Sequence, residues 1–405
     1  MLHTFACSMF ANAVRFYFNS YKGLNRDIWL LAVVNLINRC GTMVIPFLML
    51  YLTSQLGVSL SKAGIVMSLW GIGAFIGSYI GGKLTDRIGF HKIQLFSLFA
   101  GGVGFIILGQ LKSYYAICIF TFILAMINEA FRPANSAAMG KYSNEENRMR
   151  SFTLMRLSFN LGWALGAGLG GFVAHQSYQL LFWIDGITNI LAAIMLWWLL
   201  PDKYSAEQAA KHKEIPVKVS VWSDKVFVRF ILISVIYLGC FVQLFTNLPV
   251  YFKNELQLDE NYIGYLSSWN GILIVIAEMA LIYWMERNWS QQRAIVVGVL
   301  FHVLAYLMLV LFKLSFVGAV VMITFITLSE MFSFSVLVNF WMKRTDDTNR
   351  GQYAAIWTMV WATSQTAGPF LGSLVAEYGG FTLLWSLVAA LSLLSTVLYA
   401  RLIRN

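Results

Sequence analysis

Charged side chains in the middle of long apolar stretches are the first candidates for chemistry in this sequence. Glu129 and Arg132 stand three positions apart in one such stretch, and Glu330 lies inside another. A carboxyl group held away from water can exchange a proton or hold a cationic ligand, because its charge depends on its surroundings. In a helix, Glu129 and Arg132 would share a face, and Pro133 would remove a backbone donor beside them. Two interpretations follow: a titratable carboxylate whose cation a substrate displaces, or a permanent ion pair that makes two buried charges tolerable.

A second polar set lies in the first apolar stretch. Asn35, Asn38 and Arg39 follow the i, i+3, i+4 spacing that places side chains on one side of a helix. A polar stripe at this depth faces a cavity or a neighbouring helix and not lipid. Arg39 is a candidate to bind a substrate carboxylate.

Three further charged residues are weaker candidates for a functional role. Glu278 has no basic neighbour in its own stretch, so it is interpreted as a proton site or a contact for a cationic substrate. Asp185 either belongs to the same pathway or caps and pairs locally. Arg156 lies near the end of its stretch, and we expect it to extend its charge to the membrane surface.

The stretches that carry these residues are long enough to cross a membrane. The chain has 405 residues, of which 59% are hydrophobic and 12% charged, against about 45–50% and 25% in soluble domains. About 20 apolar residues span a bilayer as a helix, and twelve such stretches follow one another along the chain. They are continuously apolar, which argues against a β-barrel. The predicted fold class is an all-α integral membrane protein with twelve transmembrane helices.

The basic charge has a topological explanation. The formal net charge is +10, and 22 of the 29 Lys and Arg residues fall in the terminal segments and the loops on their side of the membrane. This asymmetry follows the positive-inside rule and predicts that both termini are cytoplasmic. The expected partner is therefore the lipid bilayer, and no nucleic acid is required.

Other function classes find little support. The four cysteines and five histidines show neither a disulfide framework nor metal-ligand spacing. There is no nucleophile–base set and no phosphate loop, so we expect no enzyme activity, no cofactor and no metal. The first 22 residues are interpreted as an interfacial amphipathic arm, with an over-extended start as the alternative.

A long polar segment divides the twelve stretches six and six. We expect four parts: an arm at 1–26, a six-helix bundle at 27–200, a cytoplasmic linker at 201–226 and a second six-helix bundle at 227–405.

The two halves resemble each other. Asn147-Arg148 matches Asn349-Arg350 at an offset of 202, and Glu129 matches Glu330 at an offset of 201. Because the offset changes so little from one match to the next, the matches predict a pair of pseudo-symmetric bundles.

A charged, glycine-flanked loop at 81–92 has a recognisable pattern, Gly82-x-Leu84-x-Asp86-Arg87-x-Gly89-x-x-Lys92. It resembles the signature loop between helices 2 and 3 of major facilitator superfamily transporters, although Phe90 and His91 occupy two usually basic places. The resemblance implies that Asp86 lies against the start of helix 11, where a helix N-terminus favours an anion. We expect a latch between the bundles made by Gly82, Asp86, Arg87, Gly89 and Arg350.

Further motifs resemble the twelve-helix, proton-coupled drug-efflux branch of that superfamily. They are Arg132-Pro133-Ala134, a run of Gly162, Gly166 and Gly170, and Gly368-Pro369, whereas Ala167 replaces the proline typical of antiporters.

The resemblance implies a monomeric transporter of the bacterial inner membrane that works by alternating access and exports drugs or small amphipathic metabolites in exchange for protons. One alternative is proton-coupled uptake of peptides or small organic acids, which Arg39 motivates. A transporter-like membrane sensor is the other.

Overall fold

The computed structural model describes residues 23–144, 146–200, 221–345 and 349–404. Within these ranges the chain is almost entirely helical and contains no strand. The predicted arm at 1–22 and most of the predicted linker lie outside the described residues.

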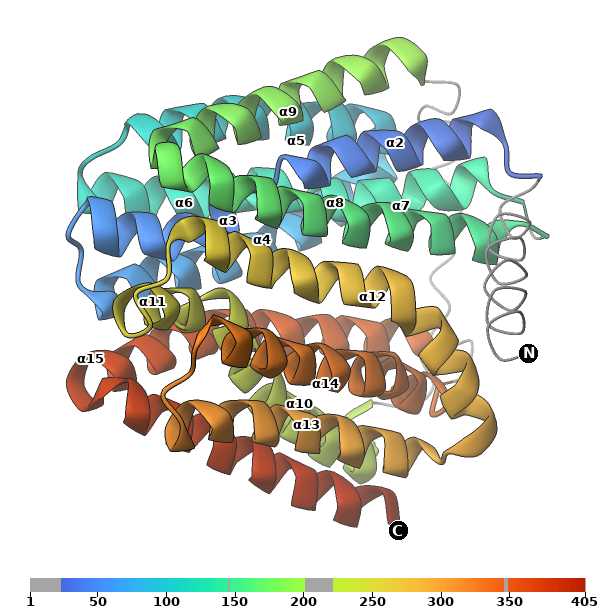
Figure 1. Cartoon of the computed structure of the whole chain (residues 1–405). Coiled ribbons are helices and arrows are strands. Elements are labelled where there is room, and N and C mark those ends of the chain that lie inside the picture. Colours follow the sequence, from blue (N-terminus) through green and yellow to red (C-terminus); the bar gives the residue numbers. More distant parts are fainter. Residues whose placement is uncertain (1–22, 145, 201–220, 346–348, 405) are drawn as a thin grey trace, which may run out of the picture.

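Two sets of helices make up the molecule (Figure 1). The first set contains α2 (Arg26–Cys40), α3 (Val44–Leu50), α4 (Leu60–Ile88), α5 (Phe90–Gln110), α6 (Tyr114–Glu129), α7 (Phe131–Tyr142), α8 (Arg148–Gln176) and α9 (Tyr178–Leu199). The second contains α10 (Lys225–Phe241), α11 (Asn247–Asn254), α12 (Glu260–Asn288), α13 (Gln291–Leu311), α14 (Phe316–Met342) and α15 (Arg350–Arg404). They are called the N-terminal and C-terminal bundles below.

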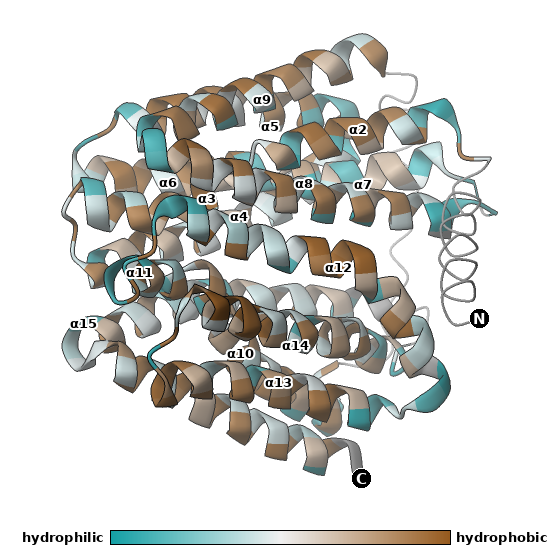
Figure 2. Ribbon diagram, in the orientation of Figure 1, coloured by the Kyte–Doolittle hydropathy of each residue, from teal (hydrophilic) through white to brown (hydrophobic). Residues whose placement is uncertain are grey.

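Most of these helices are long and apolar enough to cross a membrane. Eleven segments of the described chain meet that description, and the last, Gln352–Leu402, has 51 residues, about twice what a bilayer requires. This segment bends at Gly380, whose φ of 79° suits glycine because no Cβ atom opposes it. The bend divides the segment into two spans, which gives the predicted twelve. Apolar residues gather along the middle of the helices, and polar residues gather at their ends (Figure 2).

The start of α2 and the end of α15 lie on one side of the molecule (Figure 1). That side is called the terminal side below, and the opposite one the far side. The predicted repeat appears in the helix boundaries: α4 begins at Leu60 and ends at Ile88, and α12 begins at Glu260 and ends at Asn288, both shifted by 200 residues. The two bundles therefore have corresponding helices.

The predicted loop at 81–92 is wrong in its extent. Helix α4 continues through Gly81 and Gly82 to Ile88, and α5 begins at Phe90, so Gly89 alone makes the turn. Gly89 has a φ of 90°, a conformation that glycine adopts at low cost. Gly81 serves packing instead, since a Cβ atom there would lie 2.6 Å from the Cα of Ala130.

The bundles meet along two seams, α4 against α15 and α8 against α12. In the α8–α12 seam the backbones nearly touch, because a Cβ atom on Gly171 would lie 2.7 Å from the Cα of Gly264. In the α4–α15 seam, the backbone N–H of Ser61 donates to Oε2 of Glu377 at 2.5 Å. Both contacts lie on the far side, so the molecule is closed there.

Candidate functional site

One ion pair joins the two bundles near mid-membrane. Arg156 on α8 donates from Nη2 to Oε1 of Glu278 on α12. Glu278 is 7% exposed, and a carboxylate buried to this degree needs a partner to remain charged. The expectation that Arg156 extends to the membrane surface is therefore wrong. Sequence reasoning missed the pair because its members lie in different bundles.

Glu330 lies beside this pair. Asn270 on α12 donates one amide group both to Oγ1 of Thr327, at 3.0 Å, and to Oε2 of Glu330, at 3.4 Å. Glu330 is also within electrostatic reach of both Glu278 and Arg156. The structure thus gathers two carboxyl groups from the C-terminal bundle around one guanidinium from the N-terminal bundle. The negative charge of these carboxyl groups can be neutralised by a proton, by a cationic ligand or by Arg156, and each of the three can replace another.

The predicted local pair of Glu129 and Arg132 does not form. No ion pair joins these two residues within the described chain, and the helix is interrupted at Ala130, between α6 and α7. Pro133 has no N–H to give the Glu129 carbonyl, and Ser78 Oγ donates to it at 3.3 Å instead. The permanent ion-pair interpretation is therefore wrong.

Arg39 is buried where α2 packs against α8. Its guanidinium lies 4.7 Å from the ring centre of Phe159, which favours a cation. Its Nε has no hydrogen-bond partner among the described residues. Glu129, Arg132 and Asp185 lie within electrostatic reach of it. A buried guanidinium with an unused donor can accept an anion.

Asp185 on α9 and Asn38 on α2 make contacts at the junction between α2 and α3. The backbone N–H of Val44 donates to Oδ2 of Asp185 at 3.1 Å, at the start of α3. Asn189 donates to Oδ1 of Asp185 at 3.0 Å and accepts from Asn38 at 2.8 Å. These contacts stabilise the interrupted first span by satisfying backbone and amide groups that lack water. A pathway role for Asp185 and Asn38 stays a prediction.

Asn35 also makes contacts inside the N-terminal bundle. It accepts from Asn135 on α7 at 3.4 Å, and Asn135 accepts from Gln94 on α5 at 3.1 Å. The polar stripe of α2 therefore faces neighbouring helices, one of the two predicted environments. A pathway role for Asn35 stays a prediction.

The glycine run of α8 faces the first span. A Cβ atom on Gly162 would lie 2.5 Å from Cβ of Arg39, and one on Gly166 would lie 2.9 Å from the Arg39 carbonyl oxygen. Small residues on one face allow this close approach. The run thus positions Arg39 deep in the bundle.

The predicted gating residues lie at the terminal side. Asp86 and Arg87 are exposed in the last turn of α4, Gly82 lies one turn earlier, and Arg350 begins α15. The side chain of Arg350 lies outside the described residues, so the latch stays a prediction.

A second set of contacts on the terminal side joins Asp224 to Arg344 and Tyr353, and sequence reasoning missed it. It is called the terminal-side clasp below. Asp224 caps α10 by accepting from the N–H groups of Val226 and Phe227, and it accepts two hydrogen bonds from Arg344 at 2.7 Å. Tyr353 donates to it at 3.0 Å. Partial burial opposes ionisation of Asp224, but these donors outweigh burial and lower its pKa.

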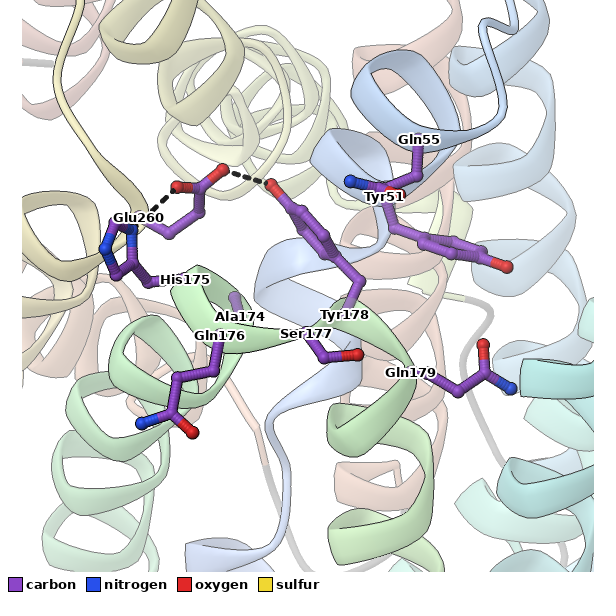
Figure 3. Close-up of a pocket in the computed structure, with 9 residues that line it drawn as sticks. All are labelled: Tyr51, Gln55, Ala174, His175, Gln176, Ser177, Tyr178, Gln179 and Glu260. Atoms are coloured by element: carbon purple, nitrogen blue, oxygen red, sulfur yellow. Dashed lines mark hydrogen bonds and ion pairs between the residues drawn. The ribbon is translucent and has the colours of Figure 1, made fainter.

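The far side carries a polar cavity of about 280 Å³ at the α8–α12 seam (Figure 3). Tyr178 and His175 enter it from the N-terminal bundle, and Glu260 enters from the C-terminal bundle. The Tyr178 hydroxyl donates to Oε1 of Glu260 at 2.7 Å. Lys253 donates to Oε2 of the same carboxylate at 3.0 Å.

Two pseudo-symmetric helical bundles that enclose charged residues at mid-membrane define the class of secondary transporters. The sequence model of the Major Facilitator Superfamily matches residues 31–362, and the chain belongs to that family. It is accordingly a multi-pass membrane transporter of small molecules, not an enzyme.

Curated relatives lie in the same family. The "Uncharacterized MFS-type transporter YqjV" of Bacillus subtilis (strain 168) is 22% identical over 326 residues, 78% of each chain. "Multidrug resistance protein MdtH" of Salmonella paratyphi B (strain ATCC BAA-1250 / SPB7) is 24% identical over 286 residues, 68% of each chain.

Solved structures agree with the fold. A POT family transporter in complex with 5-aminolevulinic acid superposes with a TM-score of 0.79 at 14% identity, over 93% of this chain and 96% of that one. At this identity the likeness shows the fold alone.

Proposed function

We propose that this transporter exports drugs or small amphipathic metabolites in exchange for protons. The carrying observation is the cluster of Glu278, Glu330 and Arg156, in which Arg156 pairs with Glu278 across the bundle boundary and Glu330 lies within electrostatic reach of both. The similarity to "Multidrug resistance protein MdtH" supports export.

The proposed cycle uses the bundles, residues 27–200 and 227–405, as two bodies that rock about this cluster. The terminal side is the cytoplasmic side, in keeping with the positive-inside distribution, and the membrane is the bacterial inner membrane. When a proton neutralises one carboxyl group, the attraction that holds Arg156 falls, and the bundles can separate there. A cationic substrate at the same carboxylates has the same effect, so proton and substrate exclude each other.

Gradient-driven transport in proteoliposomes tests the proposal. We expect Glu330→Gln and Glu278→Gln to abolish transport driven by a pH gradient while substrate exchange without a gradient continues. Glu255→Gln is the matched control, because Glu255 is exposed and lies outside the cluster. If both cluster variants still concentrate substrate, the exchange site lies elsewhere.

Glu129 remains a second candidate for the proton. It corresponds to Glu330 in the repeat and lies within electrostatic reach of Arg39. Glu129→Gln in the same assay separates the two carboxylates: intact gradient-driven transport in this variant would assign the proton to the C-terminal bundle alone.

Proton-coupled uptake of peptides or organic acids is the second candidate function. The observation that favours it is the buried Arg39 guanidinium with an unused Nε donor, which suits a substrate carboxylate. Counterflow of a labelled dipeptide that is present in the wild type and absent in Arg39→Ala would favour uptake. Its absence in both would leave export as the function.

A further inference from the structure

Three ligand-type side chains meet at the far-side end of the α8–α12 seam. His175, Asp259 and Glu260 each offer one nitrogen or oxygen atom, and these atoms lie within 4.8 Å of one another. His175 comes from the N-terminal bundle, whereas Asp259 directly precedes α12 and Glu260 is its first residue. None of the three belongs to the mid-membrane cluster.

The geometry is close to that of a metal site. Zinc binds histidine nitrogen and carboxylate oxygen at about 2.0–2.2 Å, so two atoms on one ion are about 3.4 Å apart at tetrahedral angles. Nδ1 of His175 lies 3.7 Å from Oε2 of Glu260. The side chains of His175 and Asp259 are about half exposed, at 47% and 56%, so rotation about their own bonds can close the remaining gap.

The carboxylates already hold a cation of the chain itself. The ammonium of Lys253 lies 3.0 Å from Oε2 of Glu260 and 3.8 Å from Oδ1 of Asp259. An ammonium on a four-carbon stem can leave this position, which a free ion cannot share with it. Lys253 is therefore an internal competitor that sets the affinity for any external cation.

We propose that His175, Asp259 and Glu260 bind a divalent cation of the zinc class across the far-side seam, and that the bound ion arrests the transport cycle. Histidine together with carboxylates suits zinc, whereas magnesium requires an octahedron of oxygen ligands. The cavity beside Glu260 leaves room for water as a fourth ligand (Figure 3).

The bound ion would arrest the transport cycle because its ligands come from both bundles. The ion can reach His175 and the two carboxylates together only while the bundles are closed on the far side. A ligand that binds one state better shifts the population toward that state by the ratio of its affinities. Zinc therefore holds the far side shut, and it acts from that side of the membrane.

Binding of zinc chloride to untagged protein is measured by isothermal titration calorimetry, with no transport substrate present. We expect wild type to bind one Zn²⁺ per chain, and MgCl₂ at equal concentration to leave this binding unchanged. His175→Gln and Asp259→Asn should weaken binding at least about tenfold, because each removes a ligand or a charge at contact distance. Lys253→Gln should tighten it about tenfold by removing the competing charge. The matched control Glu255→Gln should bind like wild type.

The arrest is measured by hydrogen exchange and by transport. Zinc should slow exchange at the far-side ends of α8 and α12 in wild type and in Lys253→Gln, but not in His175→Gln. In proteoliposomes, zinc on the far side should inhibit transport at lower concentration in Lys253→Gln than in wild type. Equal zinc binding by wild type and His175→Gln, or no gain in Lys253→Gln, would overturn the proposal. Since calorimetry needs neither substrate nor gradient, these outcomes are independent of proton coupling.

Discussion

Two buried carboxylates, Asp185 of the N-terminal bundle and Glu278 of the C-terminal bundle, find their partners in opposite ways. In the N-terminal bundle, Asp185 is satisfied by its own bundle, through the Val44 backbone and Asn189. In the C-terminal bundle, Glu278 obtains its counter-charge from Arg156 of the other bundle. A carboxylate satisfied within one rigid body stabilises that body, whereas one satisfied across a moving boundary couples its charge state to the motion. The second arrangement is the one a transport cycle can use.

The largest effect is expected when the cross-bundle pair is broken on one side only. Arg156→Gln leaves Glu278 buried without a cation. Because the Arg156 side chain is itself 47% exposed, the cost is below the about 3–5 kcal/mol of a fully buried pair, unless the carboxyl group takes a proton. We expect this variant to lose gradient-driven transport and to bind a proton more tightly. The double variant Arg156→Gln with Glu278→Gln removes both charges and should recover thermal stability but not coupling. If the single variant is as stable as wild type, the charges of Arg156 and Glu278 do not stabilise each other.

A structural effect is expected for the carboxylate of the N-terminal bundle. Asp185→Asn keeps the shape but places an amide nitrogen or a neutral oxygen opposite the Val44 N–H. We expect a loss of about 1–3 kcal/mol of stability, seen as a lower melting temperature, with coupling retained in the protein that folds. Lost coupling at unchanged stability would place Asp185 in the transport pathway and weaken the contrast between the bundles.

A smaller effect is expected at the terminal-side clasp of the C-terminal bundle. Asp224→Asn removes the charge that Arg344 contacts, and for a partly exposed pair we expect about 0.5–1 kcal/mol. Because the folded state lowers the pKa of Asp224, its contribution is complete above the unfolded pKa of about 3.9 and is lost as the pH falls through the folded value. The melting-temperature difference from wild type should therefore be present at neutral pH and disappear in acid.

The smallest effect on binding is expected at the predicted latch. Asp86→Asn should leave substrate affinity unchanged and shift the balance between the two access states, since Asp86 is exposed at the end of α4, far from the mid-membrane charges. Accessibility labelling on the two sides of the membrane measures that balance. Reduced affinity with an unchanged balance would contradict the latch.

Properties that depend on local composition were predictable from the sequence. A run of apolar residues must cross the membrane as a helix because its backbone groups find no water there. The number of spans, the two halves and the correspondence of α4 with α12 therefore followed from hydropathy and spacing alone. Asn35, Asn38 and Arg39 were expected to face a cavity or a neighbouring helix because polar groups avoid lipid, and the structure buries all three.

The partners of the buried charges were decided only by the tertiary structure. Spacing along one helix predicted a pair between Glu129 and Arg132, but no ion pair joins them within the described chain. Arg156 looked like a surface-directed side chain because its partner, Glu278, belongs to another bundle. Charge pairing depends on distances of a few ångströms between helices, and a sequence contains no direct information about which helix faces which.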